Sequence, residues 1–126
     1  MARLINLKTI TDTRGSLTVI ERVIPFEIKR IFYVNGPDQF KKGDHQQRMK
    51  QAVICLKGSC LIISRSGAEE QHFILNSADQ CLLLGPEDRH EMLEISSESI
   101  LMVLASEPFG HVDCVQEPRR YELSLS

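Results

Sequence analysis

Apolar and polar positions alternate in short runs along the whole chain. The runs are rich in β-branched and aromatic residues, and turn signals separate them at intervals of roughly ten residues, which is typical of an all-β sandwich or barrel. The expected strands cover residues 4–7, 16–20, 26–34, 52–56, 60–64, 70–75, 80–84, 89–95 and 99–105. Residues 112–115 and 121–125 are candidate edge strands. No stretch shows a convincing helical period, so we predict a small jelly-roll barrel.

Some of these runs are apolar at every position. ICL, CLII, CLLL and ILMVLA contain no polar interruption, which indicates strands that are buried on both faces. In so small a barrel, one of the two covered faces needs a partner subunit. We therefore predict a homodimer with a sheet-to-sheet contact. The length of 126 residues, without a linker or an internal repeat, favours a single domain over residues 1–126.

Residues 43–59 form the stretch in which polar and apolar positions are most clearly divided. If this stretch is extended, His45, Gln47, Met49 and Gln51 share one face, and Val53 and Cys55 continue it. The polar end suits the mouth of a barrel, and the apolar end suits its closed interior. Small β-barrels hold small ligands at such a mouth.

Composition narrows the functional classes further. The chain is 42% hydrophobic and 25% charged, with a formal net charge of −2, so no overall field draws it to nucleic acid or to an anionic membrane. Its N-terminus is too short and too polar for a signal peptide, and runs such as 100–105 are too short to span a bilayer. The four cysteines lack zinc-type spacing, and we expect reduced, buried thiols in a cytoplasmic protein.

A histidine at a barrel mouth first suggests a metal site. The residue two positions after His45 is Gln47, and only Gln51 and His90 remain to complete a set. Two imidazoles and two amides are a poor ligand set for Zn²⁺ or Fe²⁺. We therefore expect no metal.

Acid–base chemistry on an organic ligand is the alternative. Histidine titrates near neutrality and moves protons in either direction, so His45 is the candidate proton carrier. The phenol of Tyr33 could polarise a carbonyl. Arginine pairs well with phosphate oxygens, which makes Arg14, Arg30 and Arg48 candidate ligand contacts.

A structural interpretation competes with each of these assignments. A lone histidine near a strand start is more often a surface residue than a catalytic one. Arg30 and Tyr33 are three residues apart, so on a regular strand they cannot both face one cavity. His72 alternates with apolar neighbours and is expected on the surface, and His111 lies in the tail without a partner in view.

Several segments together resemble a known family. DTRGSL (12–17), PFEIKRIFYV (25–34), KGDH (42–45), QAVICLKGSC (51–60), LGPEDRHEM (84–92) and ILMVLAS (100–106) occur in this order. They are similar to the sugar 3,4-ketoisomerases of dTDP-deoxysugar biosynthesis, the WxcM-like cupins. The resemblance implies a dimeric jelly-roll cupin, a double-stranded β-helix, that works without a cofactor. It implies isomerisation of a dTDP-4-keto-6-deoxyhexose to its 3-keto isomer, for surface-polysaccharide synthesis.

One motif departs from the family pattern. The family's segment reads close to RG-x-HAH, whereas this chain has KGDHQQ at residues 42–47 and keeps at most one histidine. Glutamine is no general base near pH 7. Under the isomerase hypothesis, His45 carries the proton with help from Tyr33. The substrate contacts are Arg14, Arg30, Gln47, Arg48, Gln51 and His90. The alternative hypotheses are an impaired cupin that binds a sugar nucleotide as a sensor or accessory module, and a cupin acting on another ligand.

Overall fold

The computed structural model describes residues 2–35, 45–46 and 49–107. Within these ranges every regular element is a β-strand. No helix in the described ranges is long and apolar enough to cross a bilayer. The strands are β1 (Arg3–Asn6), β2 (Lys8–Asp12), β3 (Gly15–Val19), β4 (Arg30–Asn35), β5 (His45–Gln46), β6 (Gln51–Lys57), β7 (Cys60–Ser66), β8 (Glu69–Leu75), β9 (Gln80–Leu84), β10 (Arg89–Leu93) and β11 (Ile100–Ala105).

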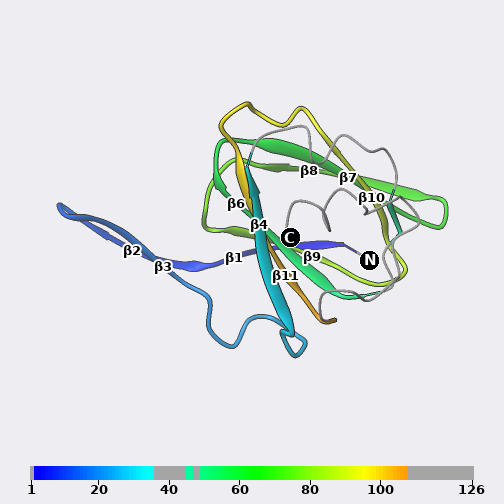
Figure 1. Ribbon diagram of the computed structural model, residues 1–126, viewed down its shortest axis with the longest axis horizontal. Helices are drawn as coiled ribbons and strands as arrows, with labels where there is room; N and C mark the ends of the chain where they lie inside the picture. Colours follow the sequence, from blue (N-terminus) through cyan, green and yellow to red (C-terminus); the bar gives the residue numbers. More distant parts are fainter. Residues whose placement is uncertain (1, 36–44, 47–48, 108–126) are drawn as a thin grey trace, which may run out of the picture.

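Two antiparallel sheets face each other (Figure 1). One sheet has five strands in the order β1-β9-β6-β11-β4, and the other has four in the order β5-β10-β7-β8. Apart from the hairpin β7–β8, neighbours in the two sheets are distant in sequence, as in a jelly roll, where the chain crosses between sheets. The jelly-roll fold predicted from the sequence is therefore confirmed.

The main hydrophobic core lies between these two sheets. Val53, Leu82 and Leu101 of the five-stranded sheet belong to the same buried cluster as Ile62 and Met92 of the four-stranded sheet. Burying each large aliphatic side chain fully contributes roughly 2 kcal/mol to folding. The alternation along β6, where Val53 and Cys55 face this core, follows the sequence prediction.

A second buried cluster covers the other face of the five-stranded sheet. Ala52, Ile54, Cys81, Leu83 and Leu104 belong to it, and residues of the segment before β4 pack over them, namely Ile24 and Phe26. Two-sided burial was the prediction made for the apolar runs, and it holds here. The cover is partial, because Ile31, Tyr33 and Leu56 remain exposed.

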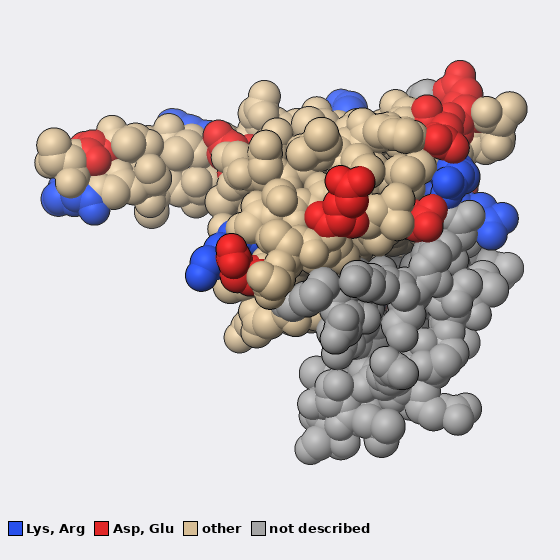
Figure 2. Space-filling model, turned by 90° about the horizontal axis from the view of Figure 1, so that it is seen from above, with Lys and Arg blue, Asp and Glu red and all other residues tan. Residues whose placement is uncertain are grey.

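The ribbon β2–β3 stands clear of both sheets (Figures 1 and 2). Among the strands of the described ranges, β2 and β3 pair only with each other. Ile10 and Leu17 lie opposite each other in this pairing and are both exposed. An isolated two-stranded ribbon is only marginally stable in water, and this one leaves an apolar pair exposed.

The three described cysteines are free and buried, as expected. Burial raises the pKa of Cys60 to about 12 and that of Cys81 to about 11, so both remain neutral thiols at physiological pH. Cys114 and the candidate edge strands 112–115 and 121–125 lie outside the described residues.

Candidate active site

One end of the barrel carries the polar interior residues. The turn between β6 and β7 closes the opposite end, so the beginning of β6 and the end of β7 lie together at what we call the mouth. The ends of β9 and β11 and the beginning of β4 reach the same level, because their register aligns with Gln51 at the start of β6.

A row of four residues crosses the five-stranded sheet at the mouth. Arg30 pairs with Ala105, Ala105 with Gln51, and Gln51 with Leu84. Residues directly opposite each other in a sheet point to the same face. Leu84 belongs to the core between the sheets, so this row faces the interior. Gln51 is buried and Arg30 half-buried, which places an amide and a guanidinium inside the mouth.

A second row crosses the four-stranded sheet at the same end. His45 on β5 pairs with His90, His90 with Ser64, and Ser64 with Gln71. The next inward row contains Met92 and Ile62, which are core residues, so the side chains of His90 and Ser64 also face the interior. Only 5% of His90 and 1% of Ser64 is exposed. The backbone positions of two histidines thus lie side by side at the mouth.

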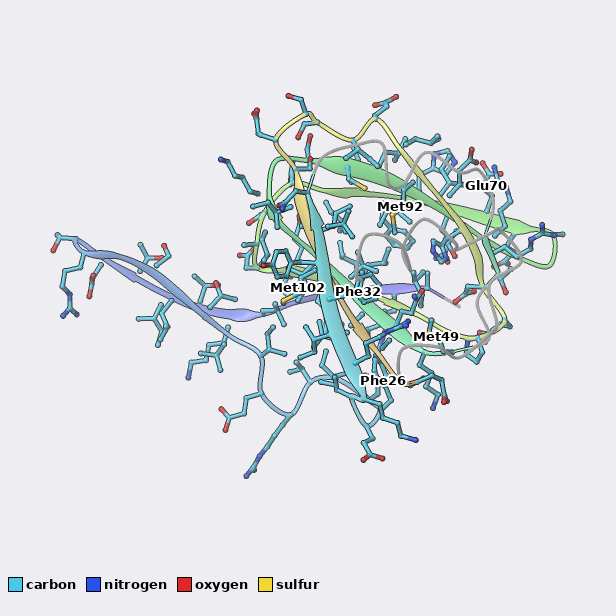
Figure 3. The ribbon with its side chains drawn as sticks, viewed as in Figure 1. Phe26, Phe32, Met49, Glu70, Met92 and Met102 are labelled. Atoms are coloured by element: carbon cyan, nitrogen blue, oxygen red, sulfur yellow. The ribbon has the colours of Figure 1, made fainter. Side chains whose placement is uncertain are left out.

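Arg30 contacts an aromatic ring and a thioether. Its guanidinium lies over the Phe32 ring, 5.0 Å from the centroid, which is a cation–π contact. Its Nη2 atom lies 3.7 Å from the sulfur of Met49. Both contacts are with uncharged groups, and they orient the guanidinium at the mouth. Figure 3 shows Phe32 and Met49 on the side of the barrel formed by β4.

The structure corrects the expectation for Tyr33. This residue lies on β4 with parity opposite to that of Arg30 and Phe32, and 67% of it is exposed on the outer face of the sheet. Its phenol therefore cannot assist chemistry in the mouth of its own subunit. The sequence had already shown that only one of Arg30 and Tyr33 could face the interior, and the structure selects Arg30.

Arg14 also lies far from the mouth of its own chain. It follows β2 at the tip of the ribbon, where 88% of its side chain is exposed. Its Nη2 atom lies 2.7 Å from Oδ2 of Asp12, and this hydrogen bond lowers the pKa of Asp12. The expected contact between Arg14 and the ligand is therefore not made within one subunit.

Three predicted site residues lie wholly or partly outside the described residues. The backbone of His45 lies in β5, but its side chain is outside what the structure describes. Gln47 and Arg48 are likewise outside the described residues. His72, in contrast, is exposed and its Nε2 lies 2.7 Å from Oε2 of Glu70, as expected for a surface residue. In the described ranges no three His, Cys, Asp or Glu side chains gather as a metal site would require.

A cleft of about 280 Å³ borders the mouth. Met49, which contacts Arg30 on one side, also lines this cleft. Figure 3 shows Met49 near the end of β4 at which Phe26 lies, and both residues belong to the lining. The full lining is Phe26, Glu27, Lys29, Met49, Lys50, Pro86, Ser106 and Glu107.

Sequence reasoning missed Ser64. It continues the interior stripe of β7 after Cys60 and Ile62, yet it carries a hydroxyl group. The signal was a single polar residue at an inward position of an apolar strand. Without the pairing of β7 with β10, nothing in the sequence connects Ser64 to His90.

Comparison with known proteins agrees with this architecture. The sequence model of the family described as FdtA, WxcM-like, C-terminal, matches residues 1–125. The chain is 38% identical over 119 residues to the TDP-4-oxo-6-deoxy-alpha-D-glucose-3,4-oxoisomerase of Aneurinibacillus thermoaerophilus. That match covers 91% of this chain and 86% of the relative.

Two solved structures extend the match to three dimensions. The WlaRB TDP-quinovose 3,4-ketoisomerase from Campylobacter jejuni superimposes with a TM-score of 0.83, at 33% identity and with 95% of each chain covered. A variant of the 3,4-ketoisomerase QdtA from Thermoanaerobacterium thermosaccharolyticum, solved in complex with TDP-4-keto-6-deoxyglucose, gives a TM-score of 0.81. It is 33% identical, over 98% of this chain and 92% of that one. The chain belongs to the WxcM-like FdtA family.

Proposed function

We propose that this single-domain protein is a sugar-nucleotide 3,4-ketoisomerase, which converts a TDP-4-keto-6-deoxyhexose to its 3-keto isomer in deoxysugar biosynthesis. The observation that carries the proposal is the pairing of His45 with His90 at the barrel mouth, in a chain whose relatives are named for this reaction. Two histidine positions at one mouth suit a reaction that moves protons at two neighbouring carbons.

The reaction needs proton transfers and no external oxidant or reductant. A base removes the proton from C3, next to the C4 carbonyl, and an enediolate forms. The proton balance is completed when C4 receives a proton and the hydroxyl proton passes from O3 to O4, which leaves the carbonyl at C3. Imidazoles are suited to both steps because their pKa lies near neutrality. We assign these transfers to His45 and His90, without a metal or an organic cofactor.

The substrate contacts of the proposal come from both sheets. Arg30 supplies a positive charge, which suits the diphosphate or the developing enediolate. Gln51 supplies an amide for the sugar hydroxyls, and Gln47 and Arg48 remain predicted contacts on the segment leading to β6. The burial of Gln51 and the partial burial of Arg30 support this arrangement, since water screens interactions less strongly there.

A homodimer is part of the proposal. The exposed apolar residues on the outer face of the five-stranded sheet, Ile31, Tyr33 and Leu56, support a sheet-to-sheet contact. The ribbon β2–β3 carries Ile10 and Leu17 outward from its own barrel. In such a dimer the ribbon reaches the second subunit, and Arg14 at its tip serves that subunit's mouth. A nucleotide-sugar substrate and a net charge of −2 favour a cytoplasmic enzyme without nucleic-acid or membrane partners.

Proton exchange tests the proposed reaction. The protein is incubated with TDP-4-keto-6-deoxyglucose in deuterated water, and incorporation of deuterium next to the carbonyl is followed by NMR. We expect exchange and conversion to the 3-keto sugar, with a loss of about 100-fold or more in His45→Gln and in His90→Gln. Exchange that persists at the original rate in both variants would remove the histidines from the mechanism.

One observation favours a second candidate function. Gln47 stands where the family motif has its second histidine, and an amide cannot replace an imidazole as a base. A protein that binds the sugar nucleotide as a sensor or accessory module would then remain. Micromolar binding of TDP without any exchange in the wild-type protein would support this module and refute the isomerase.

A further inference from the structure

Met49 is a nearly buried methionine that lies beside the guanidinium of Arg30. It precedes β6 by two residues and is 5% exposed. Burial alternates from Met49 through the exposed Lys50 to the buried Gln51, so the inward face of β6 extends to Met49. Nη2 of Arg30 donates a hydrogen bond to the sulfur of Met49 over 3.7 Å. Met49 therefore contacts one of the polar groups that the five-stranded sheet places in the mouth.

The backbone beside Met49 is attached to the end of β11. The amide of Lys50 donates to Oγ of Ser106 over 2.9 Å, and the amide of Ser106 donates to the carbonyl of Lys50 over 3.0 Å. Ser106 directly follows β11, whose last residue pairs with Arg30 on β4. The two bonds continue the contact between β6 and β11 to the residue next to Met49, and this places Met49 at a defined position relative to Arg30.

A thioether suits the task of orienting a guanidinium that also binds a ligand. Methionine sulfur is polarizable and accepts hydrogen bonds only weakly. It can direct one N–H group of Arg30 and still give way to a stronger acceptor, such as a phosphate oxygen. Leucine would fill a similar volume but could not accept this hydrogen bond. Together with the ring of Phe32, 5.0 Å from Cζ of Arg30, the sulfur gives the guanidinium two contacts in the mouth.

We propose that Met49 is a positioning residue, whose thioether orients Arg30 for contact with the diphosphate of the sugar nucleotide. The inference rests on the proposed function, because it takes Arg30 as a substrate contact. Met49 acts through Arg30 and not on the reacting carbons of the sugar. Its loss should therefore lower the affinity for the nucleotide and leave the proton transfers unchanged.

Met49→Leu tests this assignment. We expect the Kd of TDP to rise about threefold, which is the effect of losing one weak orienting hydrogen bond. KM for the sugar nucleotide should rise by the same factor with kcat within a factor of about two, since only uniform binding is lost. The melting temperature should stay close to that of the wild-type protein, because the exchange conserves volume. Wild-type affinity for TDP in Met49→Leu would overturn the proposal.

Two further variants show whether the effect passes through Arg30. Met49→Gln keeps an acceptor on a side chain of similar length and should retain most of the affinity. An affinity as low as that of Met49→Leu would refute a role for the acceptor. In a double-mutant cycle, Met49→Leu should change the Kd of the Arg30→Met protein by less than about 1.5-fold, because no guanidinium is left to orient. The same threefold loss in both backgrounds would mean that Met49 acts independently of Arg30, and would refute the positioning role.

Met102→Leu is the matched control. Met102 lies on β11 and packs against the buried cluster on the outer face of the five-stranded sheet, whereas Arg30 faces the interior. The exchange is chemically identical to Met49→Leu, and the affinity for TDP should remain that of the wild-type protein. An equal loss in Met102→Leu would mean that removing either thioether lowers the affinity, and would refute a specific role for Met49.

NMR of the arginine side chain separates this inference from the proposed function. In ¹⁵N-arginine-labelled protein, with the Arg30 signals assigned through Arg30→Met, Met49→Leu should shift the Nε and Nη resonances of Arg30. Unchanged resonances would refute the hydrogen bond whatever the affinity. A wild-type protein that does not bind TDP would refute the proposed substrate contact, and shifted Arg30 signals would then show that the two side chains meet without serving it.

Discussion

The guanidinium of Arg30 lies over the ring of Phe32 and beside the thioether of Met49, at the mouth of the barrel. Arg30→Met should therefore weaken TDP binding roughly tenfold, because a charge-assisted contact to phosphate is lost. The melting temperature should change little, since methionine preserves the packing. Calorimetric titration with TDP measures the effect.

Arg89→Met is the control for that experiment. Arg89 precedes His90 on β10 and is exposed on the outer face of the sheet. The Arg89→Met variant should bind TDP with wild-type affinity. Equal affinities for Arg30→Met and the wild-type protein would show that Arg30 does not contact the nucleotide.

The buried thiols predict a pH dependence of stability. Burial raises the pKa of Cys60 from 9.0 to about 12, so the folded protein retains this proton after the unfolded chain has lost it. Stability from this group is present below pH 9 and is lost between pH 9 and 12, because the unfolded state then binds fewer protons. Urea titrations at pH 8 and pH 10 should show a smaller loss of stability in Cys60→Ala than in the wild-type protein. Equal losses would contradict the assignment.

For single residues, the sequence predicted which side chains share a face of a strand, but it did not predict which residues lie opposite them on neighbouring strands. Strand parity correctly opposed Arg30 and Tyr33, because alternation depends only on local geometry. The position of Ser64 opposite His90 depends on the register between β7 and β10, which is set by contacts far apart in the chain. Tyr33 was misassigned for the same reason, since nothing local states which face of β4 is covered.

Among the elements, the turn between β6 and β7 closes the barrel and depends on one glycine. Gly58 has φ +82°, and a Cβ at this position would lie 2.9 Å from the backbone of Ser99. Gly58→Ala should destabilise the protein by about 2 kcal/mol or more, through left-handed strain and the clash. Thermal and urea unfolding measure this change.

Gly67→Ala provides the comparison for Gly58. It shares the left-handed conformation, with φ +61°, but a Cβ there would meet open space. Only the conformational cost of about 1 kcal/mol should remain. If both variants lose the same stability, the contact between the β6–β7 turn and Ser99 does not constrain the fold.

Strand boundaries were predicted well where turn signals are strong. The expected strand 80–84 coincides with β9, and the expected strand 60–64 falls within β7. Residues 8–12 were not recognised as a strand, although they form β2. Every residue of β2 is exposed, so the strand lacks the alternation of burial that makes strands visible in sequence.

For the whole molecule, substitutions on the outer face of the five-stranded sheet test whether the protein is a homodimer. Ile31 is 59% exposed there, beside the exposed Tyr33 and the covered cluster of Leu104. Ile31→Asp should shift the solution mass from twice 14.3 kDa toward 14.3 kDa, because a charge in an apolar interface is costly. Light scattering at micromolar concentration measures this. Ile74→Asp, equally exposed but on the four-stranded sheet, should leave the mass unchanged. A monomeric wild-type protein would refute the dimer.

The projecting ribbon leads to a prediction about mixed dimers of two inactive variants. If Arg14 at its tip serves the neighbour's mouth, an Arg14→Ala chain retains an intact mouth, and a His90→Gln chain retains an intact arm. Each variant alone should be inactive, but co-refolding the two should regenerate about a quarter of the sites, since random pairing leaves one functional mouth in half of the dimers. Activity that stays absent on mixing would mean that each barrel works with its own arm or with none. Two defective alleles could thus complement each other in one cell.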